Sequence, residues 1–105
     1  MSFTGNEDHT IPVKDAAEMN KRFRDEYPDQ PKGIYFSQAT LNNILEQSNC
    51  VGIRFYFALD ENYEMRLTFC GVQEDENDIL DIVGDGGMLC PPHCGTADDL
   101  NSDPK

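Results

Sequence analysis

The sequence predicts an α+β fold in which two amphipathic helices pack on a small antiparallel sheet built around a β-hairpin. Apolar residues recur with helical spacing in two stretches, one between residues 13 and 27 and one that begins near Ser37. Two runs rich in β-branched and aromatic residues follow, at residues 51–59 and 63–71. Two strands alone are marginally stable in water, so we expect both helices to cover one face of the hairpin.

The first helix is expected over residues 13–27. Its apolar positions lie three or four residues apart, and they are Val13, Ala16, Met19, Phe23 and Tyr27. Charged side chains occupy the opposite face, and Pro28 follows directly, where a proline ends a helix. We interpret the apolar stripe as part of the core rather than as a binding surface.

The second helix is expected to begin after Ser37, because a serine side chain accepts hydrogen bonds from N–H groups of the first helical turn. Phe36 and Leu41 flank this cap in the arrangement of a hydrophobic staple. Ile44 and Leu45 continue the apolar stripe. Residues 33–36, which precede the helix, fit either a short strand or a linker.

The expected register of the hairpin follows from its turn. Residues 60–62 are turn formers, so Leu59 should face Tyr63. The core face then consists of the pairs Phe57 with Met65, Phe55 with Leu67, and Ile53 with Phe69. The opposite face is more polar and pairs Gly52 with Cys70.

The chain becomes acidic after the hairpin. Apolar residues between Ile79 and Val83 fit one short strand or a turn of helix, and from Gly84 on the glycines and prolines predict an irregular acidic C-terminal tail.

The length of 105 residues suits a single domain. We therefore expect three parts, which are a flexible lead at residues 1–10, a single small α+β domain at residues 11–96 and a flexible tail at residues 97–105.

The charge of the chain restricts its partners. Eight Lys and Arg against twenty Asp and Glu give a formal net charge of -12, which repels nucleic-acid phosphates and anionic lipid headgroups. We therefore expect no nucleic-acid and no membrane partner. The first twenty residues lack the basic and apolar regions of a signal peptide, so the expected compartment is the cytoplasm.

The stretch with the most chemistry is CPPHCG, near the C-terminus. Cys90, His93 and Cys94 are soft ligands of the kind that zinc or copper(I) prefers, and Cys50 and Cys70, near the open end of the hairpin, are candidates to join them. Free thiols, a metal site and a Cys90–Cys94 disulfide all fit this spacing. A reducing cytoplasm favours thiols, and Cys50 and Cys70 also fit the role of small buried apolar residues.

The sequence contains no recognisable catalytic constellation. Cys94 as a nucleophile with His93 as its base lacks an orienting third group and an oxyanion site. We therefore expect a non-catalytic interaction or accessory protein that binds another protein and needs no cofactor. The alternative is a metal-binding (zinc or copper) or thiol-redox protein that uses the CPPHC segment.

The segment LEQSNCVGIRFYFALDENYEMRLTFCGV, together with the downstream CPPHCG, resembles a family of short, acidic, uncharacterised bacterial proteins. These share a GCxGIRxYF-like strand, a hairpin and a C-terminal CPPxC motif. The resemblance covers most of residues 13–100 and implies a bacterial origin without implying an activity.

Overall fold

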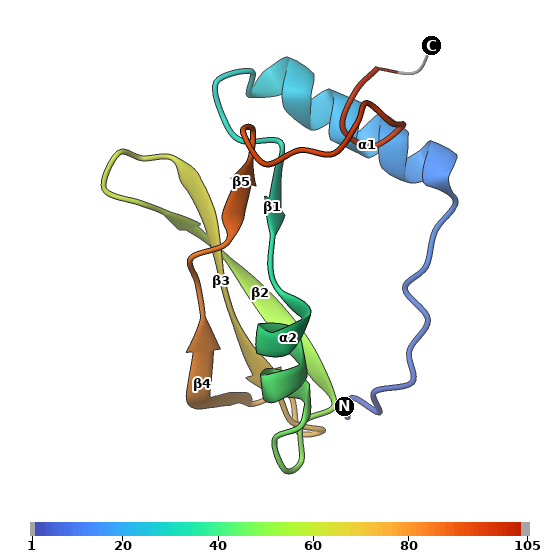
Figure 1. Ribbon diagram of the computed structural model, residues 1–105. Helices are drawn as coiled ribbons and strands as arrows, with labels where there is room; N and C mark the ends of the chain where they lie inside the picture. The colour runs from blue at the N-terminus through green and yellow to red at the C-terminus, as the bar shows by residue number, and fades with distance from the viewer. Residues whose placement is uncertain (1, 104–105) are drawn as a thin grey trace. The chain divides into compact units, whose positions relative to one another are not determined.

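A computed structural model describes residues 2–103, which divide into two compact units (Figure 1). The sheet unit comprises residues 2–8 and 36–87, and the ribbon unit comprises residues 9–35 and 88–103. Both helices and both sheets are present as separate elements, and every strand pair is antiparallel. The predicted α+β class is therefore confirmed.

The sheet unit consists of one helix and three strands. The strands are β2 (Gly52–Leu59), β3 (Met65–Val72) and β4 (Asp78–Gly84), in the order β2-β3-β4. Helix α2 (Gln38–Leu45) contacts all three strands. Its predicted start is confirmed, because the Ser37 Oγ accepts a hydrogen bond of 3.2 Å from the Thr40 N–H.

The observed register of the hairpin differs from the predicted one by two residues. Leu59 lies opposite Met65 and Phe55 lies opposite Phe69. The cause is the turn: the Asp60 carboxylate accepts hydrogen bonds from the N–H groups of Asn62 and Glu64, at 2.8 and 3.0 Å, and so orders a five-residue connection instead of a three-residue one. Because the shift is an even number of residues, every side chain keeps its predicted face.

The aromatic part of the core occupies only one end of that face. The Phe69 ring is 1% exposed, with the rings of Phe36 and Phe55 at centroid distances of 4.5 and 5.2 Å. Gly84 pairs with Phe69 across the sheet, and a Cβ at this glycine would overlap the Phe69 ring. Ile44 of α2 is fully buried and lies over Gly71. The core is therefore centred on β3, at the end away from the hairpin turn.

The predicted core face is wrong at the other end of the hairpin, where Phe57 is 86% exposed and Leu59 is 58% exposed. Length explains the difference. The eight residues of α2 make a helix about 12 Å long, whereas the eight residues of β2 span about 27 Å. Helix α2 therefore leaves the turn end of this face uncovered (Figure 1).

Strand β4 resolves the choice between strand and helix for residues 79–83 in favour of a strand. It carries an irregularity, because Cys70 pairs with Val83 while the next residue, Gly71, pairs with Ile79. Residues 80–82 are the extra residues of this bulge.

The ribbon unit contains a helix and a two-stranded ribbon whose strands lie far apart in the sequence. Helix α1 covers Val13–Glu26, strand β1 covers Gly33–Tyr35 and strand β5 covers Met88–Cys90. Gly33 pairs with Cys90 and Tyr35 pairs with Met88. The predicted start of the irregular tail at Gly84 is therefore wrong, because residues 88–90 form a strand that pairs with residues 33–35.

Helix α1 confirms the predicted element but not its predicted core face. Val13, Met19 and Tyr27 of the apolar stripe are exposed, and the buried residue of this helix is Ala17.

The structure also bears on the two predicted flexible ends. The Phe3 N–H donates to the Glu74 carbonyl at 2.8 Å within the sheet unit, and residues 98–103 form a hydrogen-bonded turn, described below. Residues 1, 104 and 105 lie outside the described residues. The flexibility of residues 1–10 and 97–105, and the single domain at residues 11–96, stay predictions.

Candidate functional site

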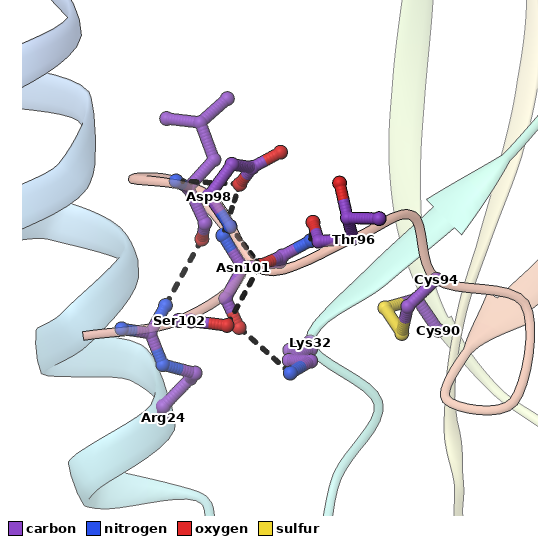
Figure 2. The surroundings of a disulfide bond; sticks show 9 residues. Arg24, Lys32, Cys90, Cys94, Thr96, Asp98, Asn101 and Ser102 are labelled. Carbon is purple, nitrogen blue, oxygen red and sulfur yellow. Dashed lines mark hydrogen bonds between the residues drawn. A yellow bond between two sulfur atoms is a disulfide. The ribbon is translucent and has the colours of Figure 1, made fainter. Parts of the chain in front are cut away.

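The CPPHC segment contains a disulfide between Cys90 and Cys94, whose Cα atoms lie 4.8 Å apart (Figure 2). Free thiols were the favoured expectation, and the structure instead shows the third of the states that fit the spacing. Cys90 ends β5 and is half-buried, and its carbonyl accepts a hydrogen bond of 2.8 Å from the Lys32 N–H. Cys94 and His93 are exposed. The two cysteine residues therefore differ in their exposure to solvent.

The disulfide decides what these residues can do chemically in this state. Zinc and copper(I) bind thiolates, and the sulfurs of a disulfide are not thiolates. Among residues 2–103, no group of three or more His, Cys, Asp or Glu side chains is arranged to hold a metal ion. Metal binding by Cys90, His93 and Cys94 stays a prediction for the reduced protein.

Cys50 and Cys70 belong to the sheet unit. Cys70 is buried and lies opposite Arg54, and burial is the main cause that raises the pKa of its thiol. The half-buried Cys50 donates its S–H to the Gly52 carbonyl at 3.2 Å. A Cβ at Gly71 would lie 2.8 Å from the Cys50 sulfur. Cys70 therefore has the properties of a small apolar core residue, as predicted.

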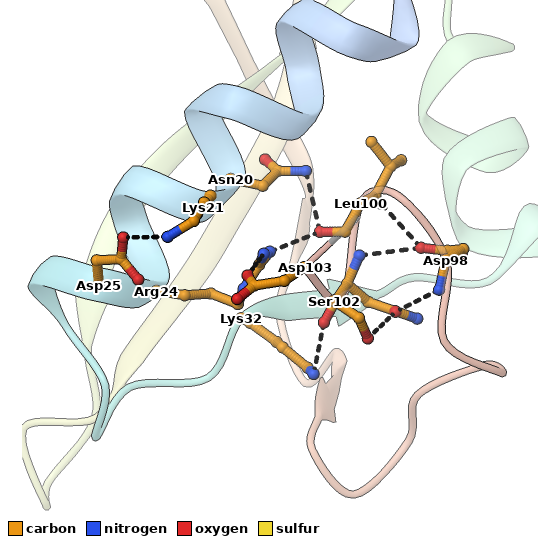
Figure 3. Close-up of polar contacts among 10 residues, drawn as sticks. Asn20, Lys21, Arg24, Asp25, Lys32, Asp98, Leu100, Ser102 and Asp103 are labelled. Atoms are coloured by element: carbon orange, nitrogen blue, oxygen red, sulfur yellow. Dashed lines mark hydrogen bonds and ion pairs between the residues drawn. The ribbon is translucent and has the colours of Figure 1, made fainter. Parts of the chain in front are cut away.

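Beyond the disulfide, residues 98–103 form a turn that we call the terminal turn (Figure 3). The Asp98 carboxylate accepts hydrogen bonds from the N–H groups of Leu100 and Asn101, both at 2.9 Å. This local pattern is that of an Asx turn, in which an aspartate side chain takes the place of a backbone acceptor.

Polar side chains of α1 and of the residue before β1 hold the terminal turn. Asn20 and Arg24 both donate to the Leu100 carbonyl, at 3.2 and 3.0 Å. Arg24 also pairs with Asp103 at 3.0 Å, and the Lys32 Nζ donates to the Asn101 carbonyl at 2.7 Å (Figures 2 and 3). The two carbonyls of this turn thus accept hydrogen bonds from three side chains.

This contact was missed from the sequence, although one signal for it existed. Asn20 and Arg24 are four residues apart and therefore lie on one side of α1. Neither residue belongs to the predicted apolar stripe of this helix.

A pocket of about 260 Å³ lies at the terminal turn and is lined by Ala97, Asp98, Asp99, Ser102 and Asp103. The lining is acidic, yet Asp98 is engaged by the backbone of the turn and Asp103 by Arg24.

A polar cluster ties β2 to β4 within the sheet unit. Arg54 of β2 forms an ion pair with Asp78 of β4 and donates to the Glu76 carbonyl at 3.2 Å, and the Tyr56 hydroxyl donates to the same carboxylate. The hydrogen bond from Tyr56, followed by those from Arg54, lowers the pKa of Asp78. The functional groups of this cluster bind one another, so we assign the cluster a structural role.

The opposite face of β2 carries exposed apolar side chains. Phe55 is 43% exposed, Phe57 is 86% exposed and Leu59 is 58% exposed, and all three alternate along one side of the strand. We call these three residues the hairpin patch.

Comparisons with known proteins identify no relative of this chain, since no protein-family model, curated protein or solved structure matches it. The resemblance to the bacterial family with a CPPxC motif stays a prediction. In the described part of the chain, neither helix has the length and apolar character needed to cross a membrane.

Proposed function

We propose that this protein is a non-catalytic protein-binding domain and that the hairpin patch is its contact surface. The observation that carries the proposal is the exposure of Phe57, an aromatic residue that is 86% exposed. Full burial of a phenylalanine side chain contributes about 1.5–3 kcal/mol. Aromatic side chains are also enriched at the centres of protein interfaces.

The backbone next to the patch supports the same conclusion. Within the described residues, β2 pairs with β3 alone and is therefore an edge strand. An edge strand offers unpaired N–H and C=O groups to an added strand, with side-chain pockets supplying specificity. An extended segment paired with β2 would place every second side chain beside the hairpin patch.

The charge of the chain favours a particular partner. A net charge of -12 favours a segment with apolar anchors and a basic rim and opposes the association of two copies. The same charge underlies our expectation that neither nucleic acid nor a membrane surface is a partner. We retain the cytoplasm of a bacterium as the expected location. Metal binding or thiol-redox activity at the CPPHC segment remains the alternative function.

The test is a comparison of two double variants in affinity capture from lysate of the source organism. Phe57→Ser with Leu59→Ser removes the patch. Leu80→Ser with Val83→Ser removes two side chains of β4 that are 71% and 58% exposed, and this variant is the matched control. We expect a stoichiometric protein to be retained by the wild type and the control and lost by the patch variant.

Equal retention by all three proteins would show that the hairpin patch is not the contact surface. The other molecule that could cover the hairpin patch is a second copy of the chain. Light scattering of the purified protein at several concentrations tests this self-association. A dimer that the patch variant disrupts would replace the proposed partner by self-association.

A further inference from the structure

We propose that the Cys90–Cys94 disulfide is a site of reversible thiol–disulfide exchange with cellular dithiols, that Cys94 is the sulfur attacked, and that opening it releases the terminal turn. The inference concerns the ribbon unit and is independent of the hairpin patch. It also gives a role to the CPPHC segment, which the proposed binding function does not use.

Access to solvent selects the sulfur. Exchange begins when a thiolate reaches one sulfur of a disulfide, so the rate depends on which sulfur is accessible. Cys94 is exposed, whereas Cys90 is half-buried at the end of β5. Pairing with Gly33 and the hydrogen bond from Lys32 to its carbonyl further fix Cys90 in the ribbon. Cys94 therefore receives the nucleophile, and Cys90 is the leaving group.

The electrons and protons of this exchange balance with a dithiol as the only co-reactant. One thiolate of the dithiol bonds to the Cys94 Sγ, the Cys90–Cys94 bond breaks, and the electron pair leaves on the Cys90 Sγ, which then takes up a proton. The second thiolate of the dithiol then attacks the dithiol sulfur that is bonded to Cys94. This step releases the Cys94 thiolate, which is also protonated. The protein gains two electrons and two protons, and the dithiol leaves as a disulfide.

The connection from the disulfide to the terminal turn runs through Lys32. Its backbone N–H donates to the Cys90 carbonyl at 2.8 Å, and its side chain donates to the Asn101 carbonyl at 2.7 Å (Figure 2). The disulfide thus links Cys94, where the C-terminal segment begins, to Cys90. Cys90 is hydrogen-bonded to Lys32, the residue that also binds the terminal turn. Only residues 95–97 lie between Cys94 and the turn.

Without the disulfide, the remaining contacts of the terminal turn are weak. They are exposed hydrogen bonds and one ion pair, in which the Arg24 side chain is 16% exposed and the Asp103 side chain is 67% exposed. Ion pairs with one partner in solvent add little to stability. The chain between Cys90 and Asn101 also gains freedom once the ring of residues 90–94 opens. In a reducing compartment, disulfides that do form are usually transient, catalytic or redox-sensing, which agrees with a switch.

The first experiment tests the chemistry on the wild-type protein. In native buffer, a neutral dithiol such as dithiothreitol should raise the count of reagent-accessible thiols by two while the far-ultraviolet circular dichroism of the protein is unchanged. With excess glutathione and iodoacetamide as a trap, fragment-ion mass spectrometry should place glutathione on Cys94 and the alkyl group on Cys90. Reduction only in denaturant, glutathione on Cys90, or no disulfide after treatment with oxidised glutathione would each overturn the proposal.

The second experiment tests the release of the terminal turn by amide NMR. On reduction, the Leu100 and Asn101 signals should move toward random-coil positions, while the signals of β2 and β3 stay in place. The double variant Cys90→Ser with Cys94→Ser should show the shifted signals without reductant and respond no further, and Cys50→Ser is the control that should behave as wild type. Identical Leu100 and Asn101 signals in the oxidised and reduced wild type would refute the release.

Discussion

The sheet unit and the ribbon unit are stabilised in different ways. Among residues 2–103, six apolar residues are buried in the core. Five of them belong to the sheet unit, and these are Ile44, Phe69, Cys70, Val72 and Ile79. The ribbon unit contributes Ala17, and it also contains the disulfide and the polar contacts of the terminal turn. Burial of apolar surface dominates in the first unit, and a covalent link with exposed hydrogen bonds dominates in the second.

This difference implies that the two units respond to different perturbations. A cavity in the core lowers the stability of the sheet unit without touching the ribbon. A reductant acts on the ribbon unit, because the cysteines of the sheet unit are already thiols. The comparison can therefore be tested one unit at a time.

The largest effect is expected from Phe69→Ala. This substitution removes a buried ring that contacts two other aromatic rings, and it should lower the free energy of unfolding by about 3–5 kcal/mol. Phe57→Ala removes the same side chain from an 86% exposed position on the same face and should change stability by less than about 0.5 kcal/mol. Urea unfolding of both variants measures the difference, and similar midpoints would show that Phe57 is covered in solution.

A smaller effect is expected from replacing both Cys90 and Cys94 by serine. The disulfide closes a ring of residues 90–94, and chain-entropy arguments give a stabilisation of about 2 kcal/mol for a ring of this size. Hydrogen exchange should show faster exchange of the β1 and β5 amides and unchanged exchange in β3. If the exchange of the β3 amides becomes faster by the same factor as that of the β1 and β5 amides, the two units unfold together. That outcome would support the single domain predicted at residues 11–96.

The smallest effect is expected from pH and concerns Asp78. Its folded pKa lies below the unfolded value because Tyr56 and Arg54 bind the carboxylate. The ionised form therefore stabilises the sheet unit above the unfolded pKa of about 3.9, and this stabilisation is lost as the pH falls through the folded pKa. Asp78→Asn should lower stability at pH 7 and flatten the loss between pH 5 and 3. Asp81→Asn, on the exposed side of β4, is the control, and an equal flattening there would remove Asp78 as the cause.

Local signals predicted most of the secondary structure. The Ser37 cap fixed the start of α2, and the two β-rich runs located the hairpin. The register was wrong because the Asp60 side chain lengthens the turn, a contact that composition alone does not reveal. The pairing of β1 with β5 was missed because short strands far apart in sequence identify each other only through the folded chain.

The candidate site was predicted at the level of residues but not of chemical state. The spacing of Cys90 and Cys94 is compatible with thiols, a metal site or a disulfide, and the redox environment decides among them. Asn20 and Arg24 were assigned no role, since their acceptors are backbone carbonyls in the terminal turn and carry no sequence signature.

The chain enters each unit twice, so the two units are completed at different points of synthesis. The sheet unit is complete once residue 87 has been made, whereas β1, made earlier, has no partner until residues 88–90 follow. The residues of the hairpin and its core are therefore synthesised before the last strand of the ribbon. The ribbon is thus the part of the protein whose second strand is made last, and residues 36–87 lie between its two strands.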